Sequence, residues 1–370
     1  MVSVMKTLGL YIHIPFCKSK CAYCDFYSLA HGEAHMDGYA AALAAALRRA
    51  APMAAEYVAD TVYFGGGTPS YFGAARLAAL LDVVAKHYAV APDAEITAEA
   101  NPESARDEDA LRTLRGAGFN RLSLGMQSAD DGELRAAGRI HTAADTAAAV
   151  DAARRAGFDN LSLDLIYGLP GQTRARWRAN LDAAAALAPE HLSCYGLKVE
   201  PGTPLWRDRV SVPDDDAQAE MYLDAVAYLE ARGYRQYEIS NFARPGRESR
   251  HNLKYWTLGE YLGFGPGAHS DFGGRRFAVA RALDAFLAGR TVYSEDAAAT
   301  PRERAAERVM LGLRTAAGLD AETLAGAEGV LRDCAAHGLA ERVGTRWRLT
   351  PHGFLVSNAI ILRVQDALGL

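Results

Sequence analysis

Short apolar runs alternate with amphipathic stretches along the first half of the chain. The apolar runs predict six β-strands, at residues 8–15, 61–64, 95–100, 120–125, 160–165 and 191–199. The stretches between them favour helices, at residues 37–49 (with Asp37 as the cap), 107–115, 143–155 and 174–187. Strands that alternate with helices form parallel βα units with right-handed crossovers. The pattern therefore predicts an α/β fold, a partial (β/α)6 TIM-like barrel.

The pattern changes after residue 199. A segment rich in Pro, Gly and Asp, over 200–216, predicts a loop that covers the open end of the barrel. The composition of residues 296–301 indicates a linker. The other elements expected in this half are helices at 217–232, 303–314 and 321–337, a strand at 234–239, and two short strands within 339–349. We therefore predict a barrel domain over residues 1–295 and a smaller domain over 296–370.

Composition and charge narrow the class of protein. Of the 370 residues, 50% are hydrophobic, so the chain can bury a large core. The formal net charge of −5 gives no general attraction to nucleic acid or anionic lipid. No apolar run approaches the roughly 18 residues of a membrane span, and residues 1–10 lack the pattern of a secretory signal. We expect a cytoplasmic protein that neither binds nucleic acid nor spans a membrane, with peripheral membrane contact left open.

Three cysteines follow the first predicted strand in a C-x3-C-x2-C arrangement: Cys17, Cys21 and Cys24. Thiolates are soft ligands that suit iron–sulfur clusters, zinc or copper(I). A cubane [4Fe–4S] cluster normally has four cysteine ligands. Three ligands would leave one iron open to a substrate or cofactor, in the way that catalytic metal sites keep an open position. A reducing compartment fits this chemistry, because the ligands have to remain free thiolates.

Two other interpretations of the cysteines remain. A structural zinc ion needs a fourth ligand, and His13 and His31 are near in sequence but lack the paired spacing of zinc sites. A disulfide framework fits poorly, since the chain has five cysteines, an odd number, with three of them in one short loop. Cys194 and Cys334 stand alone, and we expect both to be small buried apolar residues.

Glycines and polar residues follow other predicted strands at their carboxyl ends. The second strand leads into the run GGGTP at 65–69, and three further strands end at Glu99, Gln127 and Asp164. Taken singly, a glycine run is typical of an ordinary strand-to-helix turn, and a carboxylate of a loop cap. In barrel folds, however, the carboxyl ends of the strands share the face that carries the site. Glycines and polar residues at the ends of successive strands therefore predict a functional site at that face.

Residues 11–26, YIHIPFCKSKCAYCDF, resemble the radical S-adenosylmethionine (SAM) superfamily and, more narrowly, the oxygen-independent coproporphyrinogen oxidase family. The resemblance implies a [4Fe–4S] cluster whose open iron binds SAM, and which can cleave SAM to a 5′-deoxyadenosyl radical. The cluster ligands that it implies are Cys17, Cys21 and Cys24. The SAM-binding positions that it implies are Tyr11 and Tyr23 against cluster and cofactor, Gly66, Gly67 and Thr68 at the methionyl amino group, and Glu99, Gln127, Arg139 and Asp164.

A second motif, HNLKYW at 251–256, resembles the haem-binding motif of the haem-chaperone branch of that family. Neutral imidazole is a common ligand of haem iron, so the resemblance implies that His251 contributes to haem binding. The other interpretation is a packed aromatic pair, with His251 as a helix cap or a buried hydrogen-bonding residue. Residues 296–370 resemble the family's winged-helix-like C-terminal domain. Its basic residues are interspersed with acidic ones, so we expect a packing or lid element.

Two departures separate the branches of the family. The oxidase branch has a further cysteine two residues after the third ligand, where this chain has Phe26, and a longer arm before the position of Tyr11. We therefore expect a haem carrier that binds a [4Fe–4S] cluster, SAM and haem. It would act as a homodimer and deliver haem to an acceptor protein that the sequence does not identify. The alternative is a coproporphyrinogen III oxidase or another radical enzyme that acts on a tetrapyrrole. Whether SAM is cleaved stays open.

Overall fold

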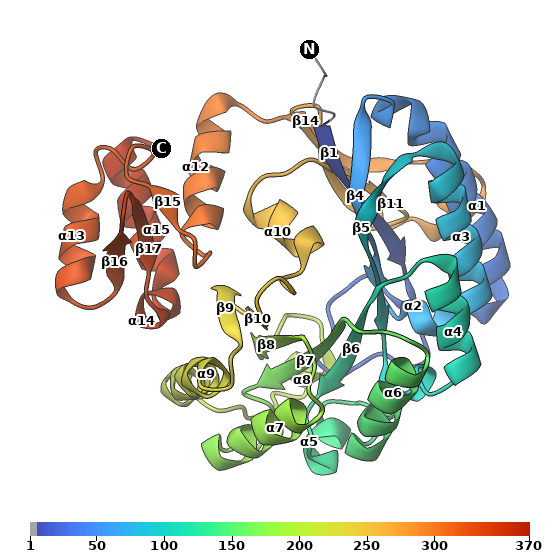
Figure 1. The fold of residues 1–370 in the computed structure, drawn as a ribbon, viewed down its shortest axis with the longest axis horizontal. Helices are drawn as coiled ribbons and strands as arrows, with labels where there is room; N and C mark the ends of the chain where they lie inside the picture. The colour runs from blue at the N-terminus through green and yellow to red at the C-terminus, as the bar shows by residue number, and fades with distance from the viewer. Residues whose placement is uncertain (1–5) are drawn as a thin grey trace.

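The computed structural model describes residues 6–370. Six strands lie side by side, all parallel and in chain order: β1 (Lys6–Ile14), β4 (Tyr57–Gly66), β5 (Ala89–Ala100), β6 (Arg121–Gln127), β7 (Leu161–Tyr167) and β8 (His191–Gly196). The sheet curves, and helices cover its outer face (Figure 1). This confirms the predicted α/β fold and partial barrel. β5 begins earlier than predicted, because pairing with β4 from Val58 onward overrides the weak strand propensity of Pro92 and Asp93.

Four of the five long outer helices agree closely with predicted ones, and the helix at residues 74–87 was not predicted. The long helices that follow the strands are α1 (Met36–Ala50), α3 (Ala74–His87), α4 (Glu108–Ala117), α6 (Ala143–Arg155) and α7 (Arg174–Ala186). Thr142 and Asp145 form a reciprocal capping box at the start of α6. The predicted cap of α1 is wrong. Asp37 lies inside the first turn, where it pairs with Arg76 at 2.7 Å, because the helix already begins at Met36.

Antiparallel strands extend both edges of the parallel sheet. Beyond β8 lie β10 (Asn241–Ala243) and β9 (Arg235–Glu238), which end the sheet on that side. At the other edge, β11 (Tyr261–Phe264) pairs in parallel with β1, and three antiparallel strands follow: β12 (His269–Phe272), β13 (Arg275–Val279) and β14 (Tyr293–Ala298). The sequence reading did not predict β11 to β14, because these strands are short and glycine turns interrupt them.

The helix that carries the HNLKYW motif, α10 (Arg250–Trp256), lies in the opening that the curved sheet leaves (Figure 1). Its N-cap is Ser249, whose hydroxyl accepts from the amide of Asn252. Lys254 pairs with Asp60, on β4, at 2.8 Å. The helix therefore fills the barrel from one side and brings its motif against the inner face of the sheet.

A small second core fastens the cysteine loop to the segment 200–216. The segment contains α8 (Pro204–Arg207), and the amide of Leu205 donates to the carbonyl of Ala22 at 3.0 Å. Leu205 also belongs to a buried cluster with Ile166 and Leu169, against which Ala22 and Tyr23 pack. The main core is separate, and it buries Cys194 and Cys334 as expected. The segment therefore covers the cysteine loop at the open end of the barrel.

The C-terminal residues form a three-stranded sheet with helices around it. Its elements are α12 (Pro301–Gly312), β15 (Leu319–Asp320), α13 (Glu328–Ala336), β16 (Ala340–Val343), β17 (Arg346–Leu349), α14 (Pro351–Leu355) and α15 (Ser357–Leu368). α13 is shorter than the predicted helix at 321–337, because Gly326 has a φ of +104° and turns precede the helix. A bridge between Glu238 and Thr315 joins this sheet region to the barrel. The predicted boundary at 295/296 falls inside β14 and stays a prediction.

The remaining elements of the described residues are short, with the exception of α9. They are β2 (Phe16–Cys17), β3 (Leu29–Ala30), α2 (Pro69–Phe72), α5 (Asp131–Ala136), α9 (Asp215–Glu230), α11 (Leu283–Leu287) and the 3-10 turns Glu33–His35, Ala51–Ala54 and Pro102–Ser104. The predicted helix at 217–232 corresponds to α9, and the predicted strand at 234–239 to β9. Over residues 6–370, no helix has the length and apolar character that a membrane crossing requires.

Candidate cofactor site

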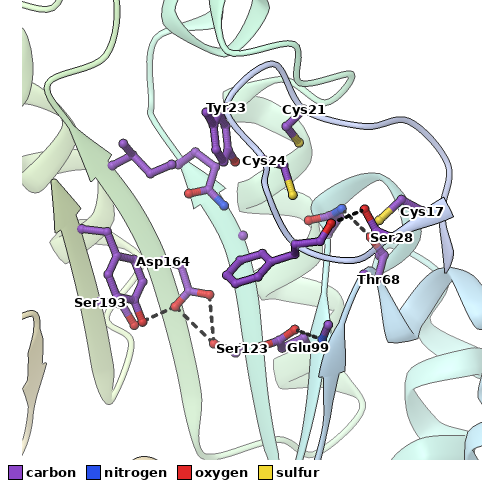
Figure 2. Close-up of a pocket in the computed structure, with 18 of the residues that line it drawn as sticks. Cys17, Cys21, Tyr23, Cys24, Ser28, Thr68, Glu99, Ser123, Asp164 and Ser193 are labelled. Atoms are coloured by element: carbon purple, nitrogen blue, oxygen red, sulfur yellow. Dashed lines mark hydrogen bonds between the residues drawn. The ribbon is translucent and has the colours of Figure 1, made fainter. Parts of the chain in front are cut away.

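A cavity of about 360 Å³ opens at the carboxyl ends of the parallel strands, and we call it the cofactor cavity. The cysteine loop borders it on one side and the strand ends on the other (Figure 2). Its walls include every residue predicted for the cluster and SAM except Tyr11: Cys17, Cys21, Tyr23, Cys24, Gly66, Gly67, Thr68, Glu99, Gln127, Arg139 and Asp164. Residues from distant parts of the chain therefore meet at the face where barrel folds carry their sites.

The three thiols lie on the loop at one end of the cavity (Figure 2). Cys17 ends the short strand β2 and is buried, whereas Cys21 and Cys24 are partly exposed. The loop is tied to the barrel, since the amide of Ala22 donates to the carbonyl of Ala137 at 3.0 Å. Burial raises the pKa of the Cys17 and Cys24 thiols. Their thiolates therefore need nearby positive charge, which a bound metal supplies.

The thiols have the donor chemistry of a cluster site, since each thiolate of a [4Fe–4S] cluster binds its own iron. Among residues 6–370, no group of three or more His, Cys, Asp or Glu side chains has the arrangement of a single-ion site. Two donors already support the thiols: Thr68 Oγ1 donates to Cys17 Sγ at 3.4 Å, and Arg139 Nη1 donates to Cys21 Sγ at 3.3 Å.

Gly66 and Gly67, at the end of β4, have no room for a side chain. Gly66 has a φ of +112°, and a Cβ there would lie 2.4 Å from His13 Cε1. At Gly67 a Cβ would lie 2.8 Å from the carbonyl oxygens of Ile14 and Phe16, and the Gly67 amide donates to Ile14 at 2.8 Å. Packing against the cysteine-bearing segment therefore requires these glycines, a reason that the sequence interpretation did not include. The glycine loop is therefore packed directly against the segment that leads into Cys17.

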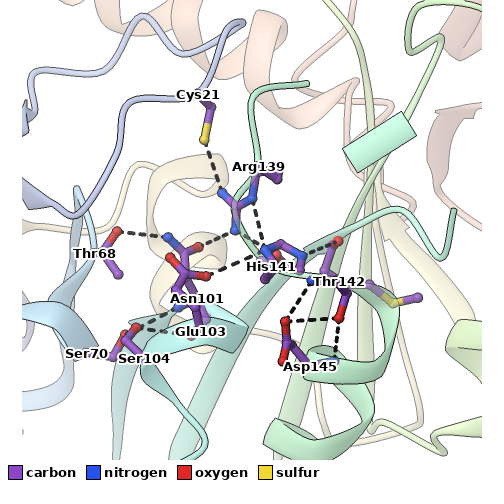
Figure 3. A network of polar contacts seen from close by, with 12 residues as sticks. Cys21, Thr68, Ser70, Asn101, Glu103, Ser104, Arg139, His141, Thr142 and Asp145 are labelled. Atoms are coloured by element: carbon purple, nitrogen blue, oxygen red, sulfur yellow. Dashed lines mark hydrogen bonds and ion pairs between the residues drawn. The ribbon is translucent and has the colours of Figure 1, made fainter. Parts of the chain in front are cut away.

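Arg139 is the centre of a polar network beside the cysteines (Figure 3). Its Nη2 donates to Asn101 Oδ1 at 2.5 Å and to the carbonyl of Gly125 at 2.9 Å, while Nη1 donates to Cys21. Asn101 Nδ2 in turn donates to Thr68 Oγ1 at 3.0 Å. The side-chain amide of Asn101 thus connects Thr68 and Arg139, the two side chains that donate to cysteines. The guanidinium is thus held in place before any ligand binds, which lowers the cost of ordering it.

Asp164, on β7, lines the cofactor cavity and accepts hydrogen bonds from three serine hydroxyls, two of which belong to residues of the cavity wall. The hydroxyl of Ser193 donates to it at 2.8 Å, that of Ser123 at 3.1 Å and that of Ser162 at 3.4 Å; Figure 2 shows the first two. Burial nevertheless raises the pKa of Asp164. Its negative charge is therefore only partly compensated by the protein, and the site favours a cationic or hydroxyl-bearing ligand.

Glu99, on β5, is the second carboxylate of the cavity. It accepts a hydrogen bond from the hydroxyl of Tyr63 at 2.8 Å and one from the amide of Gly66 at 3.0 Å. Burial raises the pKa of Glu99 to about 7, and the negative charge of Asp164 adds to the rise. Two carboxyl groups that face one cavity repel each other when both are ionised. A cation between them would relieve that repulsion.

Gln127 adopts a backbone conformation that is rare for residues other than glycine. Its φ is +61°, in the left-handed region. The register of β6 against β7 shifts between Leu124 and Gln127, as at a β-bulge, and such a shift redirects the side chain at the end of the strand. Strain of this kind is concentrated at functional sites. The predicted Gln127 therefore lies in the cavity wall because of a local irregularity.

Two predicted site residues lie outside the cofactor cavity. Tyr11 lines a second cavity, and its hydroxyl is bonded to His13 Nδ1 at 3.0 Å. His251 is 1% exposed; its Nδ1 lies 2.8 Å from Thr61 Oγ1, and its Nε2 lies 2.7 Å from the Tyr255 hydroxyl. Both ring nitrogens are therefore bonded inside the protein. This arrangement matches the alternative interpretation of His251 as a buried hydrogen-bonding residue.

Several residues of the cofactor cavity were not predicted. Asn101 follows Glu99 at the end of β5, so its position at a strand end was an available signal. Ser123 and Ser193 lie within strands, where serine gives no signal of function. Arg121 is buried at the start of β6, and its Nε has no partner among the described residues. Asn252 reaches the cavity from α10, which no argument from strand ends can identify.

The chain is similar to known proteins along most of its length. Residues 11–184 match the model of the radical SAM superfamily, and residues 299–356 match that of the HemN C-terminal domain. The chain is 41% identical to a protein of Mycobacterium tuberculosis described as heme chaperone HemW, over 95% of this chain and 93% of that one. It is 37% identical to the Escherichia coli protein of the same description, over 96% of this chain and 97% of that one.

A solved structure has the same fold along nearly the whole chain. It is the coproporphyrinogen III oxidase HemN of Escherichia coli, described as a radical SAM enzyme. The TM-score is 0.84 at 26% identity, and the match covers 97% of this chain and 90% of that one. The fold alone therefore does not separate the oxidase from the chaperones.

Proposed function

The chain belongs to the radical SAM superfamily and to the family of HemW haem chaperones, and from this membership we propose that it binds haem and delivers it to an acceptor protein. The observation that supports the proposal most is the similarity to HemW proteins over nearly the full length of both chains. The cofactor cavity adds chemical support, because it combines three thiols, a glycine loop and two carboxylates at one place. Haem carriage is thus combined with a cofactor site of the radical SAM type.

In this proposal Cys17, Cys21 and Cys24 hold a [4Fe–4S] cluster, and the rest of the cofactor cavity holds SAM. When bound, the cluster supplies an open iron and a one-electron reductant for the sulfonium. The chain's own residues orient and hold these groups. Thr68 and Arg139 donate to two of the thiols, and the amides of Gly67 and Thr68 bind the carbonyls of Ile14 and Phe16, just before Cys17. The other SAM positions that we propose are Tyr23, Glu99, Gln127 and Asp164, with Tyr11 and His251 supporting the barrel behind them.

A second candidate function is oxidation of coproporphyrinogen III, favoured by the likeness to the solved structure of HemN. Against it stands Phe26, at the position where the oxidase branch is expected to have a further cysteine. The side chain of Phe26 is 70% exposed and cannot replace a thiol as a ligand or redox group. We therefore place the carrier function first.

The proposal also covers location and assembly. We propose a cytoplasmic protein, because the three proposed ligands have to stay reduced. We further propose that it acts as a homodimer and that its haem acceptor is a separate protein. Size-exclusion chromatography with light scattering tests the dimer directly, with a mass of one chain as the contrary result.

One pair of incubations tests the function. Anaerobically reconstituted protein is mixed with haem and then with an apo-haem protein, and transfer is followed by the absorption of the acceptor. In parallel it is mixed with coproporphyrinogen III, SAM and a reductant, and products are separated by chromatography. The proposal expects haem binding and transfer without protoporphyrinogen. Formation of protoporphyrinogen that is lost in the variant without the three cysteines would favour the oxidase instead.

A further inference from the structure

A second cavity, of about 430 Å³, lies on the other side of Gly66 and Glu99 from the cofactor cavity, and we call it the aromatic cavity. Its walls come from β1, the loop after the cysteines, α10, β11 and β12. Aromatic side chains dominate these walls: Tyr11, Phe26, Tyr27, Tyr255 and Tyr261. Neither the family models nor the relatives' names assign a role to this cavity.

The aromatic rings of the walls pack against one another in pairs. Tyr255 and Tyr261 meet edge to face, with their ring centroids 4.6 Å apart and an interplanar angle of 80°. The rings of His13 and Tyr27, which also line the cavity, are stacked, with centroids 6.1 Å apart. Aromatic walls of this kind bury large planar apolar ligands, and aromatic contacts add to the free energy of burial. The aromatic lining of this cavity therefore suits a planar apolar ligand such as a macrocycle.

Three histidines lie in or beside the cavity, and only one of them has a free ring. His13 Nε2 donates to the carbonyl of Tyr27 at 3.0 Å, which leaves Nδ1 to accept from the hydroxyl of Tyr11. His251 likewise has both nitrogens bonded, to Thr61 and Tyr255. The ring of His269, at the start of β12, is exposed and makes no hydrogen bond within residues 6–370. An imidazole in that state is available to a metal.

Arg281 adds a free positive charge to the same cavity. Its side chain is exposed, and it forms no ion pair with any of the described residues. A free guanidinium beside an apolar cavity suits a carboxylate, which it can bind through two parallel hydrogen bonds. A ligand that matches all these groups is planar and apolar, carries a metal that accepts imidazole, and bears carboxylates at one edge.

We propose that the aromatic cavity is the haem site, with His269 as an axial ligand of the iron and Arg281 as the partner of a propionate. This inference rests on the proposed function, because it assigns a place to the haem that the carrier binds. It moves iron ligation away from His251, whose ring helps to hold Tyr255 in the wall instead. It also places the haem next to the cofactor cavity, because Phe26, Gly66 and Glu99 line both.

Haem titration of reconstituted full-length protein tests the ligand. Wild type, His269→Ala and His269→Met are titrated with haemin, and the bound haem is examined by resonance Raman and electron paramagnetic resonance. We expect His269→Ala to lose the imidazole signature and bind at least about tenfold more weakly. His269→Met should give a spectrum with a different axial ligand. The matched control is His352→Ala, which removes an exposed histidine from the C-terminal domain.

Haem dimethyl ester tests the role of Arg281. Arg281→Ala should weaken haem binding by about tenfold, the size of one lost charge-assisted hydrogen bond, and leave binding of the ester unchanged. Arg290→Ala, another exposed arginine, is the control. If wild type binds haem and both His269 variants keep its spectrum and affinity, the site is refuted while the carrier function stands. If wild type binds no haem, the carrier function itself is refuted, and the site with it.

Discussion

The cofactor cavity and the aromatic cavity share the wall formed by Gly66 and Glu99, but they hold their polar groups in opposite ways. In the cofactor cavity Arg139 and Asp164 each make at least two hydrogen bonds within the protein. In the aromatic cavity the rings of the walls are packed, while His269 and Arg281 have no partners among the described residues. Groups that are ordered in advance favour tight retention of a ligand. Groups that become ordered only on binding favour a ligand that is later released.

Under the proposed function, this contrast separates a resident cofactor from a cargo. Such a carrier would keep the cluster and SAM and would release haem. The two sites should therefore respond differently to the same substitutions, and the following predictions use that difference.

The largest effect is expected from removal of the three thiols. Cys17→Ala, Cys21→Ala and Cys24→Ala together should lower the iron content from about four per chain to none, because a cubane cluster depends on its thiolates. Haem binding should remain, because no cysteine lines the aromatic cavity. Iron analysis measures the iron content, and haem titration of the same samples measures haem binding.

A matched control for the thiol variant exists in the core. Cys194→Ala and Cys334→Ala each remove a buried thiol outside the loop, and both should keep the full iron content. Loss of haem binding together with iron in the triple variant would contradict the separation of the two sites. It would show that the cluster, or a cysteine, holds the haem.

His251→Ala should change stability more than haem binding. The substitution removes the partner of Thr61 and of Tyr255 and leaves a hole beneath the aromatic wall. A loss of roughly 3 kcal/mol in the free energy of unfolding is expected from two buried hydrogen bonds and the cavity. Denaturant unfolding measures this loss. The imidazole signature of bound haem should persist at concentrations where the variant is folded.

The opposite result for His251→Ala would identify His251 as the haem ligand. If His251→Ala unfolds like the wild type but loses the imidazole signature, then His251 is the ligand, and its buried position must open when haem binds. The control His352→Ala should change neither the unfolding midpoint nor the haem spectrum.

The shared wall predicts a pH effect on one site only. Because burial raises the pKa of Glu99 to about 7, its carboxyl is mostly protonated below that pH when no ligand is present. A cation such as the sulfonium of SAM favours the carboxylate, so binding below about pH 7 has to release a proton and is weaker. SAM affinity should therefore rise between about pH 6 and pH 8 in wild type and stay flat in Glu99→Gln.

Calorimetry in two buffers with different heats of ionisation counts the released proton directly. Asp164 and Arg121 also face Glu99, so the comparison with Glu99→Gln is needed to assign the proton. The folded state should also lose stability as pH rises from 4.5 to about 7, because the raised pKa means that the buried carboxylate form is disfavoured. A flat SAM affinity in wild type would remove Glu99 from the cation site.

The sequence predicted the cofactor cavity far better than the aromatic one. Residues such as Cys17 and Glu99 are local signals, since each stands at or near a strand end in a regular βα pattern. The aromatic cavity is formed by β1, α10 and the irregular strands β11 and β12, which are distant in sequence. His269 follows a glycine-rich turn, and tyrosines spread over the chain give no periodic pattern. Only tertiary packing brings these residues together. The same packing determines that both ring nitrogens of His251 are hydrogen-bonded within the protein.

The smallest effect is expected at Phe26, the exposed ring that lines both cavities. Because it is 70% exposed, Phe26→Ala should change the free energy of unfolding by less than about 0.5 kcal/mol. It should weaken haem binding by a few-fold, roughly the value of one aromatic contact, and leave the iron content unchanged. The decisive measurement is coupling: in wild type, added SAM should alter the haem spectrum across this ring, and in Phe26→Ala that response should shrink. If SAM shifts the haem spectrum equally in both proteins, contact through Phe26 does not connect the sites, and Glu99 is the remaining shared side chain through which they can influence each other.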